Sequence, residues 1–326
     1  MEHLGVVAIG RNEGERLRRC LESVVGDGRL VVYVDSGSTD DSLAMAKSLG
    51  VEVVELDLSI PFTAARARNE GWRRLCELDP ELAFVQFLDG DCELQADWLP
   101  AAWQALQQDD GLAVACGRRR ERFPEKTLLN RLCDMEWDTP IGEADACGGD
   151  ALFRIAALRE VDGFDDTSIA GEEPELCFRL RAASWRIVRL DVEMTLHDAA
   201  MDRFSQWWQR SKRAGHAYAG NFRRHSEAGF RKGQLRSAWF WGAAVPLGLI
   251  AFSMLLHPWG WLAWLVYPLQ VLRVALGLRH GHGDLPLRWH LIYAAHCIAS
   301  KFPHVAGILD ERSAHRQGRI ALIEYK

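Results

Sequence analysis

Two aspartates, Asp89 and Asp91, stand one residue apart directly behind the apolar run "AFVQFL". Two carboxylates held this close repel each other unless a cation lies between them. Divalent ions such as Mg²⁺ or Mn²⁺ take oxygen ligands of this kind, and an ion held there can bridge a diphosphate. Gly90 between the aspartates would let a sugar or phosphate approach the backbone. A solvated turn is the ordinary alternative, and the triplet alone does not separate the two.

A second candidate ligand-binding residue is Asp35 in "YVDSGSTDDS", which follows an apolar run and begins a turn of small residues. Its carboxylate could accept hydrogen bonds from an imide N–H or a ribose hydroxyl, and the small neighbours would let a planar base approach. An Asx turn followed by a helix N-cap explains the same residues equally well. Both interpretations stay open at this point.

Two further segments carry polar groups that could act on a ligand. In "DACGGDALFR", Gly148 and Gly149 precede Asp150, and paired glycines predict a loop with unusual backbone angles. In "GEEPELCFRL", Glu172 and Glu173 stand at a helix start marked by a proline in the first turn. The helix dipole alone would favour acidic residues there, but a carboxylate at that place could also take a proton from a hydroxyl.

His197 ends the apolar run "RIVRLDVEMTLH" and is a candidate third metal ligand. Histidine nitrogen and carboxylate oxygen are both common ligands of first-row divalent ions. A lone histidine is more often a structural residue, so this assignment depends on what surrounds it.

The elements that must position these groups are short strands alternating with helices. The apolar runs that predict strands cover residues 4–9, 30–34, 51–56 and 83–88. Strands alternating with helices of about a dozen residues indicate β-α-β units, an α/β fold and a mostly parallel sheet. Ligands of such sheets bind beyond the carboxyl ends of the strands. The polar residues that fall at those ends are Asn12, Glu13, Asp35, Asp89 and Asp91.

Taken together, these segments resemble the family 2 glycosyltransferases over roughly residues 4–200. The matching segments, in order, are "VVAIGRNEGERLRRCLESV", "YVDSGSTDDS", "ARARNEG", "FLDGDCEL", "CGGDALFR" and "GFDD" followed by "GEEPELCFRL". The resemblance implies a GT-A fold, which is Rossmann-like with a mostly parallel sheet and flanking helices. It also implies a nucleotide-sugar donor, usually a UDP-sugar, and an inverting single displacement.

The resemblance also implies roles for individual residues. Those expected around the nucleotide are Asn12, Glu13, Asp35, Ser38, Arg68 and Asp89. Those expected to hold Mg²⁺ or Mn²⁺ are Asp89 and Asp91, with His197 as the candidate third ligand. Those expected in the acceptor loop are Gly148, Gly149 and Asp150.

The expected catalytic base is Glu173, with Glu172 beside it. The family more commonly has Glu-Asp at this place, so the Glu-Glu pair leaves open which of the two is the base.

The C-terminal part has a different composition. Residues 201–236 hold nine Lys or Arg against two Asp or Glu, which predicts a basic amphipathic neck after the transferase domain at 1–200. Residues 237–272 hold no charged side chain at all. They predict a hydrophobic helical hairpin within 237–280, turning near 257–260, followed by an interfacial helix and tail over 281–326.

The hairpin has two alternative interpretations. Tryptophans at its ends and turn favour membrane contact over a pair of buried core helices. Whether the hairpin spans the bilayer or enters one leaflet stays open. Basic residues flank both outer ends, which predicts that both face the cytoplasm and that the protein lies at the cell inner membrane with a cytoplasmic catalytic domain.

Composition excludes some classes of protein. The net charge of -6 argues against a nucleic-acid partner. The eight cysteines form no CxxC pair, which is typical of reduced cytosolic thiols, and the N-terminus has no signal-peptide pattern. A dehydrogenase is disfavoured because no GxGxxG follows the first strand, and a nucleotidyltransferase because no basic glycine-rich loop does.

We therefore predict a metal-dependent glycosyltransferase that adds single sugars to a hydroxyl of a glycan or polyprenyl-linked acceptor at a lipid membrane. A processive polysaccharide synthase is disfavoured, because "QWWQRSKRAGHAYA" lacks the QxxRW spacing of such enzymes. Two alternatives remain. One is a polyprenyl-phosphate sugar synthase, which needs no strong base, and the other is a catalytically silent membrane scaffold.

Overall fold

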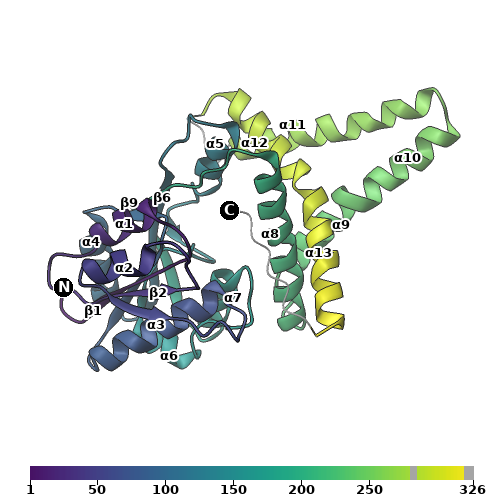
Figure 1. Cartoon of the computed structure of the whole chain (residues 1–326). Helices are drawn as coiled ribbons and strands as arrows, with labels where there is room; N and C mark the ends of the chain where they lie inside the picture. Colours follow the sequence, from purple (N-terminus) through teal and green to yellow (C-terminus); the bar gives the residue numbers. More distant parts are fainter. Residues whose placement is uncertain (280–284, 319–326) are drawn as a thin grey trace. The chain divides into compact units, whose positions relative to one another are not determined.

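The computed structural model describes residues 1–279 and 285–318. The chain divides into two compact units, Met1–Ala200 and Met201–Lys326 (Figure 1). The first unit is built on a mixed sheet and the second is built from helices.

Within the described residues, the sheet of the first unit has nine strands in the order β3-β2-β1-β4-β8-β6-β9-β5, with β7 paired to β9. The strands are β1 Leu4–Gly10, β2 Val31–Asp35, β3 Glu52–Glu55, β4 Phe84–Asp89, β5 Cys92–Leu94, β6 Leu112–Glu121, β7 Gly142–Glu143, β8 Ala151–Arg154 and β9 Arg186–His197. The pairs β3-β2, β2-β1, β1-β4 and β6-β9 are parallel, whereas β8, β5 and β7 run antiparallel to their neighbours. The predicted mostly parallel α/β sheet is confirmed.

Seven helices of the described first unit flank this sheet (Figure 1). They are α1 Glu15–Glu22, α2 Ser42–Ser48, α3 Ala64–Leu78, α4 Trp98–Gln108, α5 Leu128–Glu136, α6 Ile155–Glu160 and α7 Glu172–Ala182. Helix α3 begins where Thr63 Oγ1 accepts a 3.0 Å hydrogen bond from the Arg66 N–H, a side-chain N-cap. A β-carbon at Gly71 would collide with Val7, so this glycine lets α3 lie close against β1.

The strand register places the polar strand ends at one edge of the sheet. Gly10 at the end of β1 is opposite Asp35, and Ile9 is opposite Asp89 on the other side. The antiparallel strand β8 starts at this same edge, because Ala151 is opposite Phe87. Asp150, directly before β8, therefore lies beside the end of β4.

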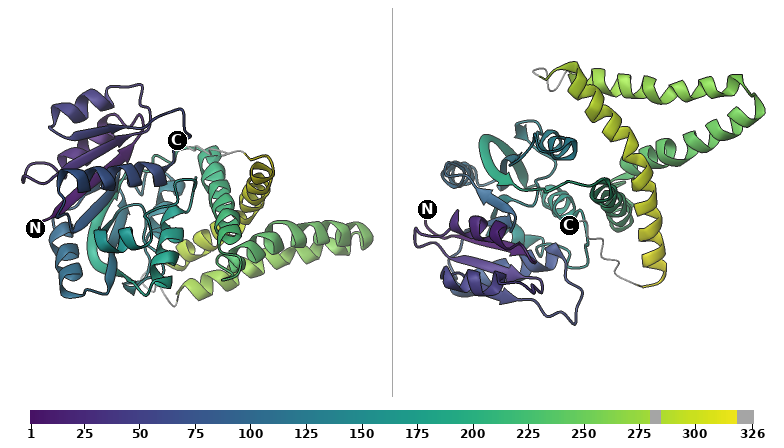
Figure 2. Two further views of the ribbon diagram at one scale, coloured as in Figure 1. Left: turned by 90° about the horizontal axis from the view of Figure 1, so that it is seen from below. Right: turned by 45° about the horizontal axis from the view of Figure 1, so that its top comes forward.

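The second unit consists of eight helical segments in its described part. They are α8 Phe204–Arg224, α9 Lys232–Trp239, the π-helical turn η1 Phe240–Ala244, α10 Val245–Leu255, the 3₁₀ segment η2 Trp259–Leu265, α11 Val266–Arg279, α12 Leu287–Ala299 and α13 Lys301–Arg316. Helices α8 and α13 lie side by side (Figure 2). Glycines make this close packing possible, because β-carbons at Gly215 and Gly307 would collide with the backbone of the opposite helix.

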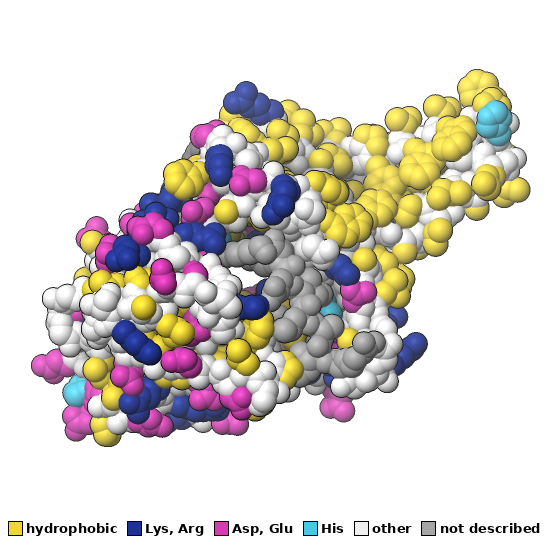
Figure 3. Space-filling view, viewed as in Figure 1, with side chains coloured by type: hydrophobic (Ala, Val, Ile, Leu, Met, Phe, Trp, Pro, Cys, Tyr) yellow, Lys and Arg dark blue, Asp and Glu magenta, His cyan; other side chains and the backbone are white. Residues whose placement is uncertain are grey.

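The apolar hairpin is present as two helical arms that meet at residues 256–258 (Figures 1 and 2). Residues Lys232–Leu255 and Trp259–Arg279 form arms of 24 and 21 residues, long and apolar enough to cross a membrane by length and composition. Hydrophobic side chains cover the arms (Figure 3), and Met254, Leu255 and Trp259 are 79%, 82% and 76% exposed. The arms are therefore not a pair of core helices of this chain.

The structure differs from the sequence prediction after the hairpin. One interfacial helix and a tail were predicted over 281–326, but Lys301–Arg316 forms a second helix, α13, that packs against α8. The buried face of α13 includes His304, Gly307 and Ile308. Such small and polar residues do not form an obvious apolar stripe, so the sequence pattern did not indicate a packed helix.

Candidate active site

Asp35 ends β2 and is only 2% exposed. Its Oδ2 accepts hydrogen bonds from the backbone N–H groups of Gly37 and Ser38, at 2.8 and 2.7 Å. Its Oδ1 accepts a 2.9 Å hydrogen bond from the hydroxyl of Tyr33. The Asx-type turn weighed in the sequence is therefore present, and it fixes the loop at the mouth of β2.

Asn12 holds the loops after β1 and β2 together. Its backbone N–H donates to Ser38 Oγ at 2.9 Å, and its side-chain Oδ1 accepts from the Thr39 N–H at 2.7 Å. Asn12 has a φ of 56°, a left-handed conformation that asparagine tolerates better than most residues. The neighbouring Glu13 lies 2.9 Å from the guanidinium of Arg16. These residues build one wall at the carboxyl edge of the sheet.

Asp89, at the end of β4, is held by two arginines. Arg68 Nη2 donates to Asp89 Oδ1 at 2.8 Å, and Arg119 Nη2 donates to Asp89 Oδ2 at 3.3 Å. The Asp89 N–H donates in turn to Asp150 Oδ1 at 2.9 Å. The charge of Asp89 is therefore balanced by arginines of α3 and β6, which explains how it tolerates the neighbouring Asp91.

Asp150 follows the two predicted loop glycines and is fully buried. Arg119 Nη2 lies 2.7 Å from Asp150 Oδ2, and the Thr195 hydroxyl donates to the same oxygen at 2.8 Å. Gly149 leaves no room for a side chain, because its β-carbon would lie 2.6 Å from Arg68 Nη2 and 2.7 Å from Asp89 Oδ2. The glycine is therefore needed for contact between this loop and the Arg68–Asp89 pair.

Asp91 pairs with a histidine, whereas Asp89 pairs with arginines. His197 Nε2 lies 3.2 Å from Asp91 Oδ2, and both side chains are buried, at 8% and 2% exposure. The contact follows from the pairing of β5 with β9, which sets Cys92 opposite His197. Two predicted metal ligands, 106 positions apart by number, thus lie side by side.

The donor set of Asp91 and His197 fits a divalent ion. Two ligands at right angles on an octahedral ion, each about 2.1 Å from it, lie about 3 Å apart. One oxygen and one nitrogen at 3.2 Å match this spacing and this chemistry. The ligand atoms of Asp91, Cys92 and His197 lie within 4.8 Å of one another, whereas Asp89 groups with Cys92 and Asp150. The two aspartates of the triplet therefore face different partners.

Glu172 and Glu173 begin α7 and both face Arg68. Arg68 Nη1 donates to Glu172 Oε1 at 3.0 Å, and Arg68 Nη2 lies 3.2 Å from Glu173 Oε1. Burial and, to a smaller extent, the charge of Glu172 raise the pKa of Glu173 to about 7, although Arg68 opposes this shift. Burial alone would lower the pKa of Arg68, but Glu173, Asp89 and Glu172 outweigh it and raise that pKa well above its ordinary value. Arg68 therefore stays charged.

The structure thus brings three predicted segments into one cluster through Arg68. Arg68 links Asp89 at the end of β4 to Glu172 at the start of α7, and the loop of Gly149 lies against this pair. Asp35, Asn12 and Ser38 lie at the same sheet edge beyond β1 and β2. The sequence reasoning missed Arg119, and the available signal was the run of three arginines that follows the apolar residues of β6. Successive side chains of a strand point to opposite faces of the sheet, so Arg119 faces away from Arg118 and Arg120. Those two arginines pair with Asp134 and Glu193, respectively.

Part of this chain matches a known family model, and several known proteins are similar to it. Residues 6–161 match the family model for Glycosyl transferase family 2. The pre-mycofactocin glycosyltransferase of Mycobacterium tuberculosis is 28% identical over 211 residues, which are 59% of this chain and 42% of that protein. This chain therefore spans less than half the length of that relative.

Two further proteins match over most of this chain. The succinoglycan biosynthesis protein ExoA of Rhizobium meliloti is 25% identical over 283 residues, 78% of this chain and 79% of that protein. A mannosyltransferase of Pyrobaculum calidifontis, solved in complex with GDP-Man and Mn²⁺, superimposes with a TM-score of 0.60 at 16% identity. That match covers 94% of this chain and 87% of the other, and it shows a shared fold. The first unit thus has the predicted GT-A fold, and the predicted resemblance to glycosyltransferase family 2 is confirmed over residues 6–161.

Proposed function

We propose that the chain transfers a sugar from a nucleoside diphosphate donor to a hydroxyl of a lipid-linked or cell-envelope glycan. The observation that carries the proposal is the set of contacts around Arg68, which joins Asp89 of the Asp-X-Asp triplet to Glu172 and Glu173. The residue proposed to bind the donor and the candidate base thereby both contact one guanidinium. Such convergence is what a single displacement between two bound substrates requires.

The donor would bind at the carboxyl edge of β1, β2 and β4. Residues proposed to contact it are Asn12, Glu13, Asp35, Ser38, Arg68 and Asp89. Buried Asp35 in its tight turn offers an acceptor for the base, and the small residues after it leave room for a planar ring. The mannosyltransferase of similar fold binds GDP-Man with Mn²⁺, and the family usually takes UDP-sugars, so we propose a nucleoside diphosphate sugar and expect UDP first.

Asp91 and His197 would hold Mg²⁺ or Mn²⁺, with Asp89 beside them. A divalent ion there offsets negative charge on a diphosphate leaving group. Asp89 is kept ionised and oriented by Arg68 and Arg119, and Asp150 fixes the position of its backbone. These contacts preorganise the triplet, so that little reorganisation is needed when a substrate binds.

Glu173 is the proposed general base, with Glu172 as its neighbour. Its carboxylate would accept the proton of the acceptor hydroxyl while that oxygen forms a bond to C1 of the sugar. The bond from C1 to the diphosphate oxygen breaks with its electron pair leaving on the diphosphate, so C1 is inverted. A base with a pKa near 7 is well matched to this task at neutral pH, since about half of it is ionised there and it still binds a proton well. The loop of Gly148, Gly149 and Asp150 would border the acceptor.

The proposed acceptor follows from the second unit. Its exposed apolar arms are suited to a bilayer, and a site anchored there meets lipid-linked substrates. Arg231 and Arg236 at the start of the first arm, and Arg273 and Arg279 near the end of the second, favour a cytoplasmic position for both outer ends. We therefore propose an inner-membrane enzyme whose transferase unit faces the cytoplasm. The relative named for succinoglycan biosynthesis supports an acceptor in glycan assembly.

The test is a donor screen with the full chain in lipid nanodiscs. Nucleoside diphosphate release would be measured for UDP- and GDP-sugars, with Mn²⁺ or Mg²⁺ and a bacterial membrane lipid extract. We expect release with at least one donor, loss of it in Asp91→Ala, and retention in the matched surface variant Asp110→Asn, whose side chain is exposed. Release that is absent with every donor would favour the scaffold interpretation instead.

A further inference from the structure

We propose that a groove at the base of the apolar arms binds the phosphate and one chain of an anionic membrane phospholipid. The groove lies entirely within the second unit, has a volume of about 920 Å³, and is lined by side chains of α8, α9, η1, α10 and α13. The proposal rests on the membrane insertion of the arms but not on sugar transfer. It assigns a ligand to a surface that the proposed catalytic cycle does not use.

Three cations supply one end of the groove: Lys232 and Arg236 of α9, and Arg312 of α13. In residues 201–279 and 285–318 none of the three pairs with a carboxylate. Two other cations of this unit are neutralised: Arg223 lies 2.9 Å from Glu311, and Lys212 pairs with Asp310. The groove therefore concentrates positive charge that no carboxylate in the described part of the unit neutralises.

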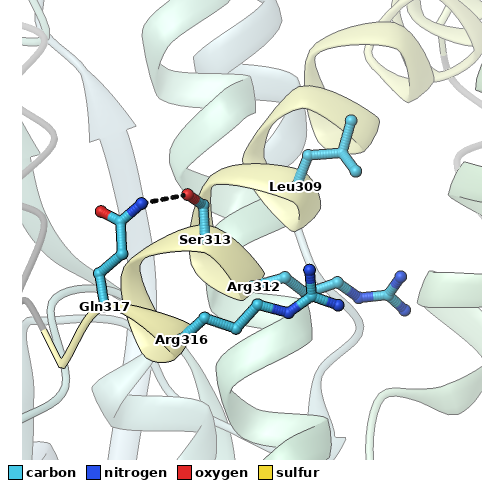
Figure 4. A pocket seen from close by; sticks show the side chains of 5 residues that line it. All are labelled: Leu309, Arg312, Ser313, Arg316 and Gln317. Atoms are coloured by element: carbon cyan, nitrogen blue, oxygen red, sulfur yellow. Dashed lines mark hydrogen bonds between the residues drawn. The ribbon is translucent and has the colours of Figure 1, made fainter.

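Arg312 extends this charge along α13. It also borders a second, smaller pocket of about 310 Å³ with Ser313, Arg316 and Gln317. Figure 4 shows Arg312 and Arg316, one helical turn apart, projecting toward the same side of the helix. Ser313 and Gln317 hydrogen-bond to each other at 3.3 Å and leave both guanidinium groups clear. A phosphate over Arg312 would thus meet a second arginine within one turn.

The remaining lining is apolar. Trp239, Phe240 and Leu247 border the groove, and Phe240 and Leu247 are 53% and 66% exposed. The guanidinium of Arg312 stacks on the Trp239 ring at 5.4 Å, which fixes the boundary between the charged and apolar parts. The turn at Phe240–Ala244 is π-helical, a distortion often found at functional sites, and four of its residues line the groove.

A groove with one cationic end and an apolar remainder matches a phospholipid better than other ligands. Free phosphate would use the cations and leave the apolar part uncovered, whereas a neutral lipid would leave the cations unpaired. The groove lies where the charged start of the first arm, at Lys232 and Arg236, meets its uncharged stretch, which is the depth of lipid head groups. Because the groove is open to its surroundings, the lipids that reach it in greatest number are those of the bulk bilayer. We therefore commit to an anionic phospholipid and treat a polyprenyl phosphate as the competing occupant.

Native mass spectrometry of the detergent-solubilised full chain tests the proposal. With phosphatidylglycerol we expect one retained lipid, bound at least about 10-fold more tightly than phosphatidylcholine of the same chains. The double variant Arg236→Gln/Arg312→Gln should reduce this binding to the phosphatidylcholine level. The matched control Arg279→Gln/Arg288→Gln removes the same charge from outside the groove and should retain the lipid.

Four results would overturn the proposal. They are equal retention of both phospholipids, equal loss in the two double variants, complete displacement of phosphatidylglycerol by equimolar undecaprenyl phosphate, and its displacement by inorganic phosphate at the same concentration. The last result would mean that the apolar part of the groove contributes nothing to binding. Near-native thermal unfolding of both variants would show that loss of lipid is not loss of fold. Failure of the donor screen leaves this measurement unaffected, so the two proposals can fail separately.

Discussion

Nη2 of Arg68 donates a 2.8 Å hydrogen bond to Oδ1 of Asp89, and it does so from a side chain that is 2% exposed. The same guanidinium contacts Glu172 and Glu173 at 3.0 and 3.2 Å. One buried cation therefore neutralises carboxylates from two separate segments. Removing a buried partner of this kind leaves charges uncompensated, whereas a surface pair contributes little.

The first prediction concerns the stability that Arg68 provides. Arg68→Met should lower the free energy of unfolding by roughly 3–5 kcal/mol, because three buried or half-buried carboxylates lose their counter-charge. Urea unfolding of the full chain, followed by tryptophan fluorescence, measures this. The control is Arg18→Met, since Arg18 pairs with Glu15 at 3.3 Å on the surface and should change stability by at most about 1 kcal/mol. Equal effects of the two variants would contradict the central role of Arg68.

The second prediction concerns the base. Glu173→Gln should reduce turnover about 10²- to 10⁴-fold, the usual contribution of a general base, with a smaller effect of Glu172→Gln. Steady-state assays at pH 8 measure the two variants side by side. The reverse ranking would assign the base to Glu172. Near-full activity of Glu173→Gln would instead support transfer to a lipid phosphate, which needs no strong base.

The third prediction concerns pH. The raised pKa of Glu173, about 7, means that the carboxylate is protonated and inactive as a base in acid. Turnover should therefore fall as pH drops through about 7 and level off above it. Stability should move in the opposite direction. A carboxyl whose pKa is raised in the folded state contributes most below its unfolded value of 4.5, and that contribution is lost as pH rises through about 7. Glu173→Gln should flatten both profiles, and an unchanged turnover profile would point to another titrating group.

The fourth prediction concerns the metal. His197→Ala should weaken Mn²⁺ binding at least about 10-fold, because an ion held with Asp91 loses one of its protein ligands. Isothermal titration of Mn²⁺ into the full chain measures this without any donor. Cys92→Ser is the matched control, since Cys92 lies in the same cluster but Mn²⁺ prefers oxygen and nitrogen ligands. A larger effect of the serine variant would assign the ion to the thiol.

Much of this site could be predicted because it lies at strand ends. Asp35, Asp89 and Asp91 follow apolar runs, and parallel strands place such ends at one edge whatever else the chain does. Arg119 could not be found in this way, because whether an arginine inside β6 faces solvent or Asp150 depends on the register with β9. The contact of Arg68 with Glu172 joins residues 104 positions apart and depends on how α3 and α7 pack. Sequence patterns of short range carry no information about such contacts.

The last prediction compares Gly148 and Gly149, two adjacent glycines of the proposed acceptor loop. A β-carbon at Gly149 would lie 2.6 Å from Arg68 Nη2 and 2.7 Å from Asp89 Oδ2, closer than real side-chain carbons approach. At Gly148 the nearest atom, Arg119 Nη2, would be 3.9 Å away, which is ordinary contact. Neither glycine has a positive φ, so the two substitutions differ in space rather than in backbone strain. Gly149→Ala must therefore push the loop or Asp89 aside.

We expect Gly149→Ala to reduce nucleoside diphosphate release by about 10²-fold, the scale on which a misplacement of about 1 Å acts, while Gly148→Ala retains most activity. Mn²⁺ titration adds a second readout, because Asp91 and His197 form a different cluster from Asp89, so that Mn²⁺ binding should change less than nucleoside diphosphate release. The two alanine variants differ by one position and have the same composition, so a difference in activity reports the contact with Arg68 and Asp89. Equal activity of both variants would mean that activity does not depend on the present position of Asp89. That result would contradict the proposed arrangement of donor and base.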